Sequence, residues 1–268
     1  MTDAEAIACR LGASLRAQLD PIEVFPELPS TNSYLLQQKA PEPGRFRAAL
    51  AEHQTAGRGR NGKTWIAAPC SSLCLSLACT FKKTPDNLAS LTLAIGAGVA
   101  EVLMRLGASD IALKWPNDLI ARGGKLGGIL IETHAGGAGV VIGLGLNVNL
   151  PKDLRESLAS SGTDRAADLA ECMDAAPGMN DLAATMIECV ATTVSRYERE
   201  GLEAFRASWQ RVDWLRGKVV ETGETNRRVR GTAEGIDGDG ALLVRTDGGL
   251  MRIVSGSVAV ADSAAACA

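Results

Sequence analysis

Apolar residues recur along the first 215 positions with two different periods. Large and small residues alternate over 73–81, which predicts a β-strand, and a second strand is predicted over 46–52. Apolar side chains at helical spacing predict a long helix over 88–106, and a continuous apolar stripe predicts another over 181–199. This part of the chain therefore contains both strands and long helices.

Shorter patterns predict the remaining elements of this region. Ser30, Thr31 and Asn32 are residues that cap helices, so a helix is expected to begin there. A turn over 122–125 between two apolar runs predicts a hairpin. The other predicted elements are strands at 111–115, 119–121, 128–133 and 139–148, and helices within 1–24, near 165–173 and at 202–212.

The pattern changes after Leu215. Short apolar runs then alternate with turns at 223–226, 237–240 and 246–249, which predicts a small β-barrel. We therefore expect a large domain over 1–215, a small β domain over 216–262, and a disordered tail over 263–268.

The segment 57–65, GRGRNGKTW, concentrates three cations and three glycines in nine residues. No acidic residue occurs between His53 and Pro85, so nothing nearby in sequence neutralises the cations. A glycine-rich loop brings backbone N–H groups close to an anion while the side chains supply positive charge. The segment therefore predicts a site for a phosphate or a carboxylate.

The same segment fits two other patterns, the P-loop and the G-x-G-x-x-G dinucleotide fingerprint. Both require a helix directly after the glycines, because the helix N-terminus binds the phosphate. The residues after Trp65 run into Pro69 and then into a predicted strand, which argues against such a helix. A purely structural hairpin loop is a further alternative, although a solvated turn has no need of three cations.

Composition narrows the classes of function. The net charge of −3 and the pI of about 5.6 argue against bulk affinity for nucleic acid or membranes. No apolar run reaches 18 residues, and the N-terminus lacks the pattern of a signal peptide. Seven cysteines without a C-x-x-C pair and only two histidines make a disulfide framework or a zinc site improbable. A protein of the reducing cytoplasm, with no metal held by its own side chains, is expected.

Three further segments combine charged or amide side chains with the ends of predicted strands. They are KWPND at 114–118, KLGG at 125–128 and GLGLNVN at 143–149. Each has a structural alternative, as an ordinary turn, an exposed lysine or a strand cap. Their occurrence together with the basic loop favours a functional site.

These motifs, in this order, closely resemble those of the biotin protein ligases. Ser30-Thr31-Asn32 and Gln54 match as well, and the resemblance extends over about 28–260. It implies an α+β catalytic domain built on a mixed sheet like that of class II aminoacyl-tRNA synthetases, followed by an SH3-like barrel. Only about 27 residues precede Pro29, so a short form without an N-terminal DNA-binding domain is expected.

The resemblance implies a reaction in two steps. ATP, with Mg²⁺, activates the biotin carboxylate as biotinyl-5′-AMP, and a lysine of a biotin carboxyl carrier protein then attacks this mixed anhydride. The carrier would belong to acetyl-CoA carboxylase or a related carboxylase. The enzyme would act as a monomer or homodimer, without nucleic acid or membrane partners.

The resemblance also implies residue roles. Arg60 would be the main phosphate partner, Lys125 would contact the carboxylate and the α-phosphate, and Asp118 would orient or deprotonate the incoming amine. Ser30, Thr31, Asn32 and Gln54 would hold the ureido ring of biotin. The other residues assigned to biotin or nucleotide are Arg58, Gly59, Lys63, Trp65, Lys114, Asn117, Gly127, Gly128, Gly143, Gly145 and Asn147. At Lys63 many members of the family carry arginine, so the planar stacking of a guanidinium is lost here.

Three alternatives stay open at this point. A lipoate ligase or octanoyl transferase would share the fold, but the basic loop together with KWPND favours biotin. A P-loop NTPase lacks its required helix. A biotin-binding protein without activity would not need Arg60 and Lys125.

Overall fold

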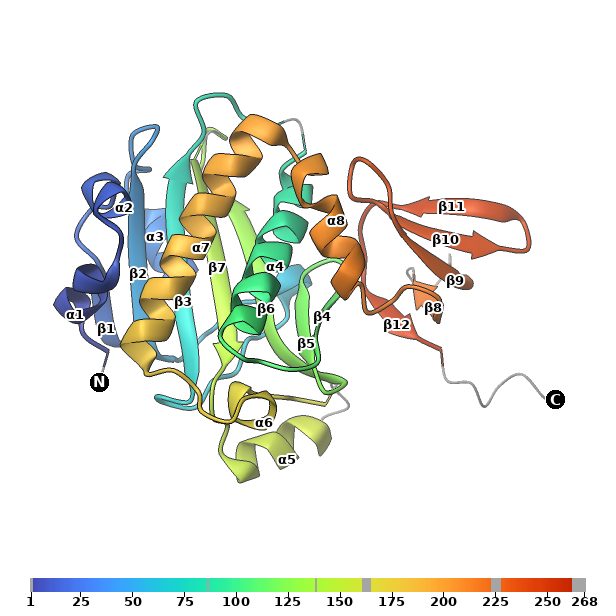
Figure 1. The fold of residues 1–268 in the computed structure, drawn as a ribbon, viewed down its shortest axis with the longest axis horizontal. Helices are drawn as coiled ribbons and strands as arrows, with labels where there is room; N and C mark the ends of the chain where they lie inside the picture. The colour runs from blue at the N-terminus through green and yellow to red at the C-terminus, as the bar shows by residue number, and fades with distance from the viewer. Residues whose placement is uncertain (1, 86, 138, 161–164, 223–227, 262–268) are drawn as a thin grey trace.

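The computed structural model describes residues 2–261 except 86, 138, 161–164 and 223–227. A seven-stranded sheet forms the centre of the larger part of the chain (Figure 1). Its strand order is β1-β2-β3-β7-β6-β5-β4, with β1 and β2 parallel and every other pair antiparallel. The sheet is therefore mixed, as expected. Its strands are β1 (Glu23–Leu28), β2 (Phe46–Gln54), β3 (Ser72–Thr80), β4 (Ile111–Lys114), β5 (Asp118–Ala121), β6 (Gly124–Thr133) and β7 (Gly139–Asn147).

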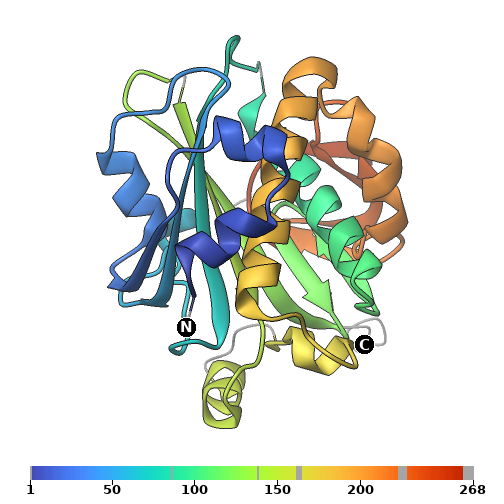
Figure 2. The same ribbon diagram turned by 60° about the vertical axis from the view of Figure 1, so that its left-hand side comes forward.

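Helices cover both faces of this sheet. On one face lie α4 (Leu88–Arg105) and α7 (Met179–Glu200), with α8 (Glu203–Val212) beside α4; α3 (Thr31–Gln37) lies on the other (Figure 2). Small residues such as Ala49 and Ala78 face α3, so Leu35 can pack closely against the sheet. The remaining helices are α1 (Ala4–Arg10), α2 (Ala13–Gln18), α5 (Lys152–Ser160) and α6 (Leu169–Cys172).

Helix α4 forms the centre of the main core. It is long and apolar enough to cross a membrane by length and composition, but 67% of it is buried within the molecule. Leu91, Ile95 and Val99 have no exposed surface. Its apolar character is therefore explained by packing between the sheet, α7 and α8.

A second, smaller sheet follows α8. It has the order β11-β10-β9-β8-β12 and is antiparallel throughout. Its strands are β8 (Val219–Thr222), β9 (Val229–Ile236), β10 (Leu242–Thr246), β11 (Gly249–Ile253) and β12 (Val258–Val260). The predicted turns at 237–240 and 246–249 connect β9 to β10 and β10 to β11, whereas the turn at 223–226 and the tail at 263–268 lie outside the described residues.

One loop of the small sheet docks on the larger part of the chain. The indole N–H of Trp115 donates to the carbonyl of Gly240 at 2.9 Å. Gly240 has a φ of +86°, and a Cβ there would lie 2.7 Å from Leu93 Cδ1. Only glycine combines this backbone conformation with so close an approach. The loop therefore fixes the small sheet beside the turn that carries Pro116.

Two sequence predictions near the N-terminus are corrected. The single helix expected within 1–24 is two short helices, and the edge strand β1 was not predicted. Pro26 lies inside β1, and a proline normally argues against a strand. At the edge of a sheet the missing N–H is tolerated, which explains the observed strand.

Three other boundaries differ from expectation. Strand β6 begins at Gly124, before the predicted 128, because β5 and β6 continue their pairing to the turn. Helix α6 starts at Leu169, since Asp168 caps it and residues 165–167 are extended beside Lys125. Helix α5 was not predicted, and its residues are mostly polar and exposed.

The buried position of α4 leads to a stability prediction. Leu91→Ala should lower the free energy of unfolding by about 3 kcal/mol, because it leaves a cavity in the core. Met104, on the same helix and 39% exposed, is the matched control, and Met104→Ala should cost less than about 0.5 kcal/mol. Denaturant unfolding of both variants measures the difference. Equal losses of unfolding free energy in the two variants would show that the buried face of α4 contributes no more to stability than its exposed face.

Candidate functional site

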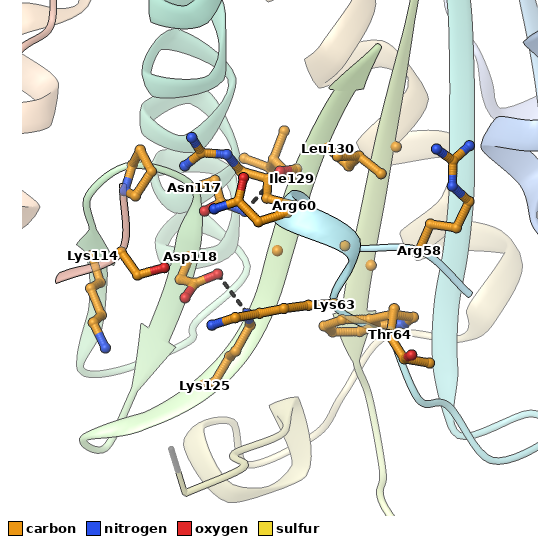
Figure 3. A pocket seen from close by; sticks show the side chains of 18 of the residues that line it. Arg58, Arg60, Lys63, Thr64, Lys114, Asn117, Asp118, Lys125, Ile129 and Leu130 are labelled. Carbon is orange, nitrogen blue, oxygen red and sulfur yellow. Dashed lines mark hydrogen bonds and ion pairs between the residues drawn. The ribbon is translucent and has the colours of Figure 1, made fainter. Parts of the chain in front are cut away.

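A cavity of about 800 Å³ opens between the basic loop, the ends of β4 to β7 and the small sheet (Figure 3). Cavities of this size bind small molecules of a few hundred daltons. The residues that were predicted from sequence and line it are Ser30, Thr31, Asn32, Gln54, Arg58, Gly59, Arg60, Lys63, Trp65, Lys114, Asn117, Asp118, Lys125, Gly128, Gly143, Gly145 and Asn147. Gly127 is the predicted residue outside the lining.

An ion pair stands at the centre of the cavity. Lys125 Nζ lies 2.6 Å from Asp118 Oδ1, and both side chains are partly shielded from solvent. The two residues come from the paired strands β6 and β5, where an irregularity in register falls between Leu119 and Ile120. The N–H of Lys125 donates to the carbonyl of Arg165, and its own carbonyl accepts from Ala167. The backbone of the lysine is therefore held from both sides.

Arg60 lies above this pair in the basic loop (Figure 3). Burial lowers the pKa of its guanidinium, and the charge of Asp118 opposes this effect. An arginine stays protonated in any case, so the shift reports a partly desolvated cation. Among the described residues no carboxylate forms an ion pair with it, and an anionic ligand would compensate the lost hydration.

A hydrogen-bonded network of neutral side chains forms the opposite end of the cavity. The Oε1 of Gln54 accepts from the backbone N–H of Thr31 at 2.8 Å. The hydroxyl of Ser76 lies 2.5 Å from Asn32 Oδ1 and 2.7 Å from Thr31 Oγ1. Sequence reasoning missed Ser76, although a serine in the middle of an apolar strand is a usable signal. The network fixes polar groups that suit an uncharged polar ligand group.

Arg58 is directed away from Lys125 (Figure 3). Its guanidinium pairs with Glu132 at 2.6 Å and donates to the hydroxyl of Ser33 at 3.2 Å. Glu132 was also missed, because nothing in the sequence around β6 distinguishes it from a surface acid. The first arginine of the loop is thus bound to a carboxylate that lies 74 residues away in sequence.

The glycines of β6 and β7 were expected to let a ligand approach the backbone. In the structure their close neighbours are protein groups. A Cβ on Gly143 would lie 2.4 Å from Asn32 Oδ1, and one on Gly145 would lie 2.6 Å from Trp65 Cε2. At Gly127 the nearest atom is the carbonyl oxygen of Gly145, at 2.6 Å. These glycines therefore provide room for the side chains that shape the cavity.

Two predicted asparagines bind backbone groups. The amide of Asn117 donates to the carbonyl of Ile129 at 3.0 Å. The amide of Asn147, which is buried, donates to the carbonyls of Ala167 and Lys125 at 3.0 and 3.3 Å. Both side chains thus hold the segments that carry Asp118 and Lys125.

Lys114 lies where the two sheets meet. Its ammonium is 5.6 Å from the ring centroid of Trp214, and Lys218 is 3.5 Å from the same ring. Burial lowers the pKa of Lys218, and the charge of Lys114 adds to the effect. An aromatic face stabilises such cations, and this contact ties the cavity wall to the start of the small sheet. Lys63, in contrast, is exposed.

Cys74 is the thiol in the cavity wall. Burial raises its pKa to about 11, with the nearby polar groups of Trp65 and Gln54 acting in the opposite direction. At neutral pH the group is a thiol, which is a poor nucleophile. Within the described residues, no three His, Cys, Asp or Glu side chains form a group that could hold a metal ion. The cavity therefore offers cations and hydrogen bonds rather than covalent catalysis.

Comparison with known sequences agrees with this chemistry. The Biotin/lipoate A/B protein ligase family matches residues 24–149, and the biotin protein ligase C terminal domain matches residues 217–260. The bifunctional ligase/repressor BirA of Escherichia coli is 34% identical over 91% of this chain and 75% of its own length. The biotin–[acetyl-CoA-carboxylase] ligase of Mycobacterium tuberculosis is 31% identical, with 88% of each chain covered.

A solved structure shares the fold. The biotin protein ligase from Aquifex aeolicus in complex with biotin and ATP superposes with a TM-score of 0.77 at 24% identity. The match covers 90% of this chain and 99% of that one. Both sheets thus belong to one known architecture.

The contact between Gly145 and Trp65 leads to a second prediction. Gly145→Ala should displace the indole, shift its fluorescence and lower the free energy of unfolding by about 1–3 kcal/mol, because the added methyl overpacks the site. Gly128→Ala is the control, since its Cβ would meet its nearest atom at 3.6 Å. In a Trp65→Phe background the fluorescence change should disappear. Its persistence there would place the disturbance at another tryptophan.

Proposed function

The chain belongs to the biotin protein ligase family, and we propose the residues through which it acts. It is an ATP-dependent ligase that attaches biotin to acetyl-CoA carboxylase by way of biotinyl-AMP. The observation that supports the assignment of residues is a cavity with a neutral, hydrogen-bonding end and a cationic end. Biotin has the complementary form, with a ureido ring at one end and a carboxylate at the other.

The ureido ring is assigned to the network around Asn32. Its carbonyl and two N–H groups need donors and acceptors fixed in place, which Thr31, Asn32 and Gln54 supply from the cavity lining. The buried hydroxyl of Ser76 holds Thr31 and Asn32 in position. The carboxylate then points toward Lys125 and Arg60. The remaining space beside Lys114 and Trp65 is assigned to ATP.

The first step joins two anions. A carboxylate oxygen of biotin attacks the α-phosphorus, a C(O)–O–P linkage forms, and the bond to the leaving pyrophosphate breaks. One unit charge at 4 Å is worth roughly 4 kcal/mol at an effective dielectric of 20. Lys125 and Arg60 therefore oppose much of the repulsion between the reactants, and no protein nucleophile is required.

Mg²⁺ is included in this proposal. Among the described lining residues only Asp118 and Glu221 are carboxylates, which fits an ion held chiefly by the phosphates of ATP. When bound, it neutralises part of the triphosphate charge.

In the second step the amine of the carrier lysine attacks the acyl carbon, the C–N bond forms and AMP leaves. The amine must lose a proton. Asp118 is placed for this because its carboxylate, now paired with Lys125, becomes available once Lys125 turns to the phosphate. We assign the carrier domain of the carboxylase as the partner, and keep the cytoplasm and a monomer or homodimer as expectations.

The choice of acid distinguishes this function from its nearest alternative. With ATP and Mg²⁺, the enzyme should form biotinyl-AMP from biotin and add one biotin to a carrier domain, as read by mass spectrometry. Lipoate and octanoate should give no adduct, because neither has a ureido ring for the neutral network. Transfer of lipoate or octanoate at a comparable rate would assign the chain to the lipoate branch.

Lys125→Ala should lower the rate of adenylate formation by roughly 10²- to 10³-fold, since a preorganised cation is lost from the transition state. Biotin binding should remain measurable. Lys125→Ala with Asp118→Asn shows whether the effect comes only from the unpaired carboxylate, and Lys39→Ala, at an exposed pair with Glu42, is the control. Pyrophosphate exchange is the assay. A rate near that of the wild type would contradict the role of Lys125.

A further inference from the structure

Glu132 connects two parts of the site without lining the main cavity. It lies on the part of β6 beyond Gly128, the last residue of β6 that pairs with β5. One carboxylate oxygen accepts from the amide of Asn32 at 3.0 Å, and the other accepts from Arg58 at 2.6 Å. A single side chain thus bonds both to the ureido network and to the basic loop.

The contact with Asn32 determines the orientation of its amide. An ionised carboxylate only accepts hydrogen bonds, so the NH₂ group of Asn32 faces Glu132. The amide oxygen then faces the hydroxyl of Ser76, at 2.5 Å. The carbonyl of Leu130 also accepts from the NH₂ group, at 3.3 Å. Without the carboxylate, the flipped orientation of the Asn32 side-chain amide would be less unfavourable. The NH₂ group and the oxygen that the amide offers to biotin could then exchange places.

The contact with Arg58 holds the start of the basic loop. Arg58 is bonded to Glu132 in β6 and to Ser33 in α3, the helix that carries Asn32, so the loop is tied to both elements. Glu132 also lines a second cavity, of about 840 Å³, whose wall includes Arg60.

We propose that Glu132 is a positioning residue that sets the amide of Asn32 and anchors the basic loop through Arg58. The proposal rests on the assignment of the Asn32 network to biotin. Its consequence is that biotin recognition and loop placement depend on one carboxylate. The positions of Asn32 and Arg58 are coupled through this carboxylate, in addition to the bonds that each makes elsewhere.

Glu132→Gln tests this with little change in volume. The two donors contact different carboxylate oxygens, and glutamine replaces one of these oxygens with an NH₂ group that cannot accept, so one of the two bonds is lost in this geometry. The dissociation constant for biotin should rise roughly tenfold, the scale of one charge-assisted hydrogen bond. The thermal midpoint should change only slightly, since a residue that merely stabilised the fold would lower it as well. Glu234→Gln, which breaks a comparable Arg–Glu pair in the small sheet, is the control and should change neither of them.

A double mutant identifies the path of the effect. Asn32→Ala should weaken biotin binding, and adding Glu132→Gln should weaken it little further, because the carboxylate acts through the amide. Additive losses would overturn the proposal, as would a single variant that binds biotin like the wild type. Should Glu132→Gln fail to fold, Arg58→Gln tests the other partner, and unchanged adenylate retention in it would refute the loop anchor. A wild-type enzyme that forms no biotinyl-AMP would instead refute the proposed function itself.

Discussion

The ion pair between Lys125 and Asp118 is the contact on which the site depends. It places a cation and a carboxylate 2.6 Å apart inside a cavity large enough for two substrates. Strand pairing and hydrogen bonds to the backbone hold these two residues in place. The irregular pairing of β5 and β6 sets their register, and the amide of Asn147 bonds to the carbonyl of Lys125 itself. The two strands thus bring opposite charges to one point. In the proposed reaction the cation would oppose the repulsion between the two anions, and the carboxylate would accept the proton in the second step.

The small sheet completes the cavity rather than standing apart from it. Trp115 and Pro116 lie in the turn between Lys114 and Asp118, and Trp115 is bonded to the loop at Gly240. Lys114 lies over the ring of Trp214, and the backbone N–H of Trp214 donates to the carbonyl of Leu113. A movement of the small sheet would therefore reach the turn that carries Asp118. This coupling between the small sheet and the turn is a physical reason for the small sheet and the larger part to belong to one chain.

The sequence indicated most of the strands, the basic loop and 17 of the 36 residues that line the cavity; the lining residues of the small sheet were not among them. These features depend on local patterns, such as the period of apolar residues or a cluster of glycines and cations. Glu132 could not be identified in this way, because its importance arises from partners 74 and 100 residues distant, whereas Ser76 left a local signal that was missed. The glycines at 143 and 145 were identified because a close approach to the backbone was expected there, but the pattern did not show that the side chains of Asn32 and Trp65 lie against them. Strand β1 was missed because the rule against proline in strands does not distinguish an edge from the centre of a sheet.

The three nearby cations differ in how they are compensated before substrates bind. Lys125 is paired with Asp118 and Arg58 with Glu132, whereas Arg60 is partly buried without an ion pair among the described residues. Partly exposed ion pairs contribute only about 0–1 kcal/mol, so a substrate anion can displace Asp118 from Lys125 at little cost. Internal carboxylates can therefore keep a strongly basic cavity stable without ligand and still leave its lysine available. Arg60 has no carboxylate partner of this kind among the described residues. Burial lowers the pKa of its guanidinium, so a bound phosphate would compensate for its lost hydration.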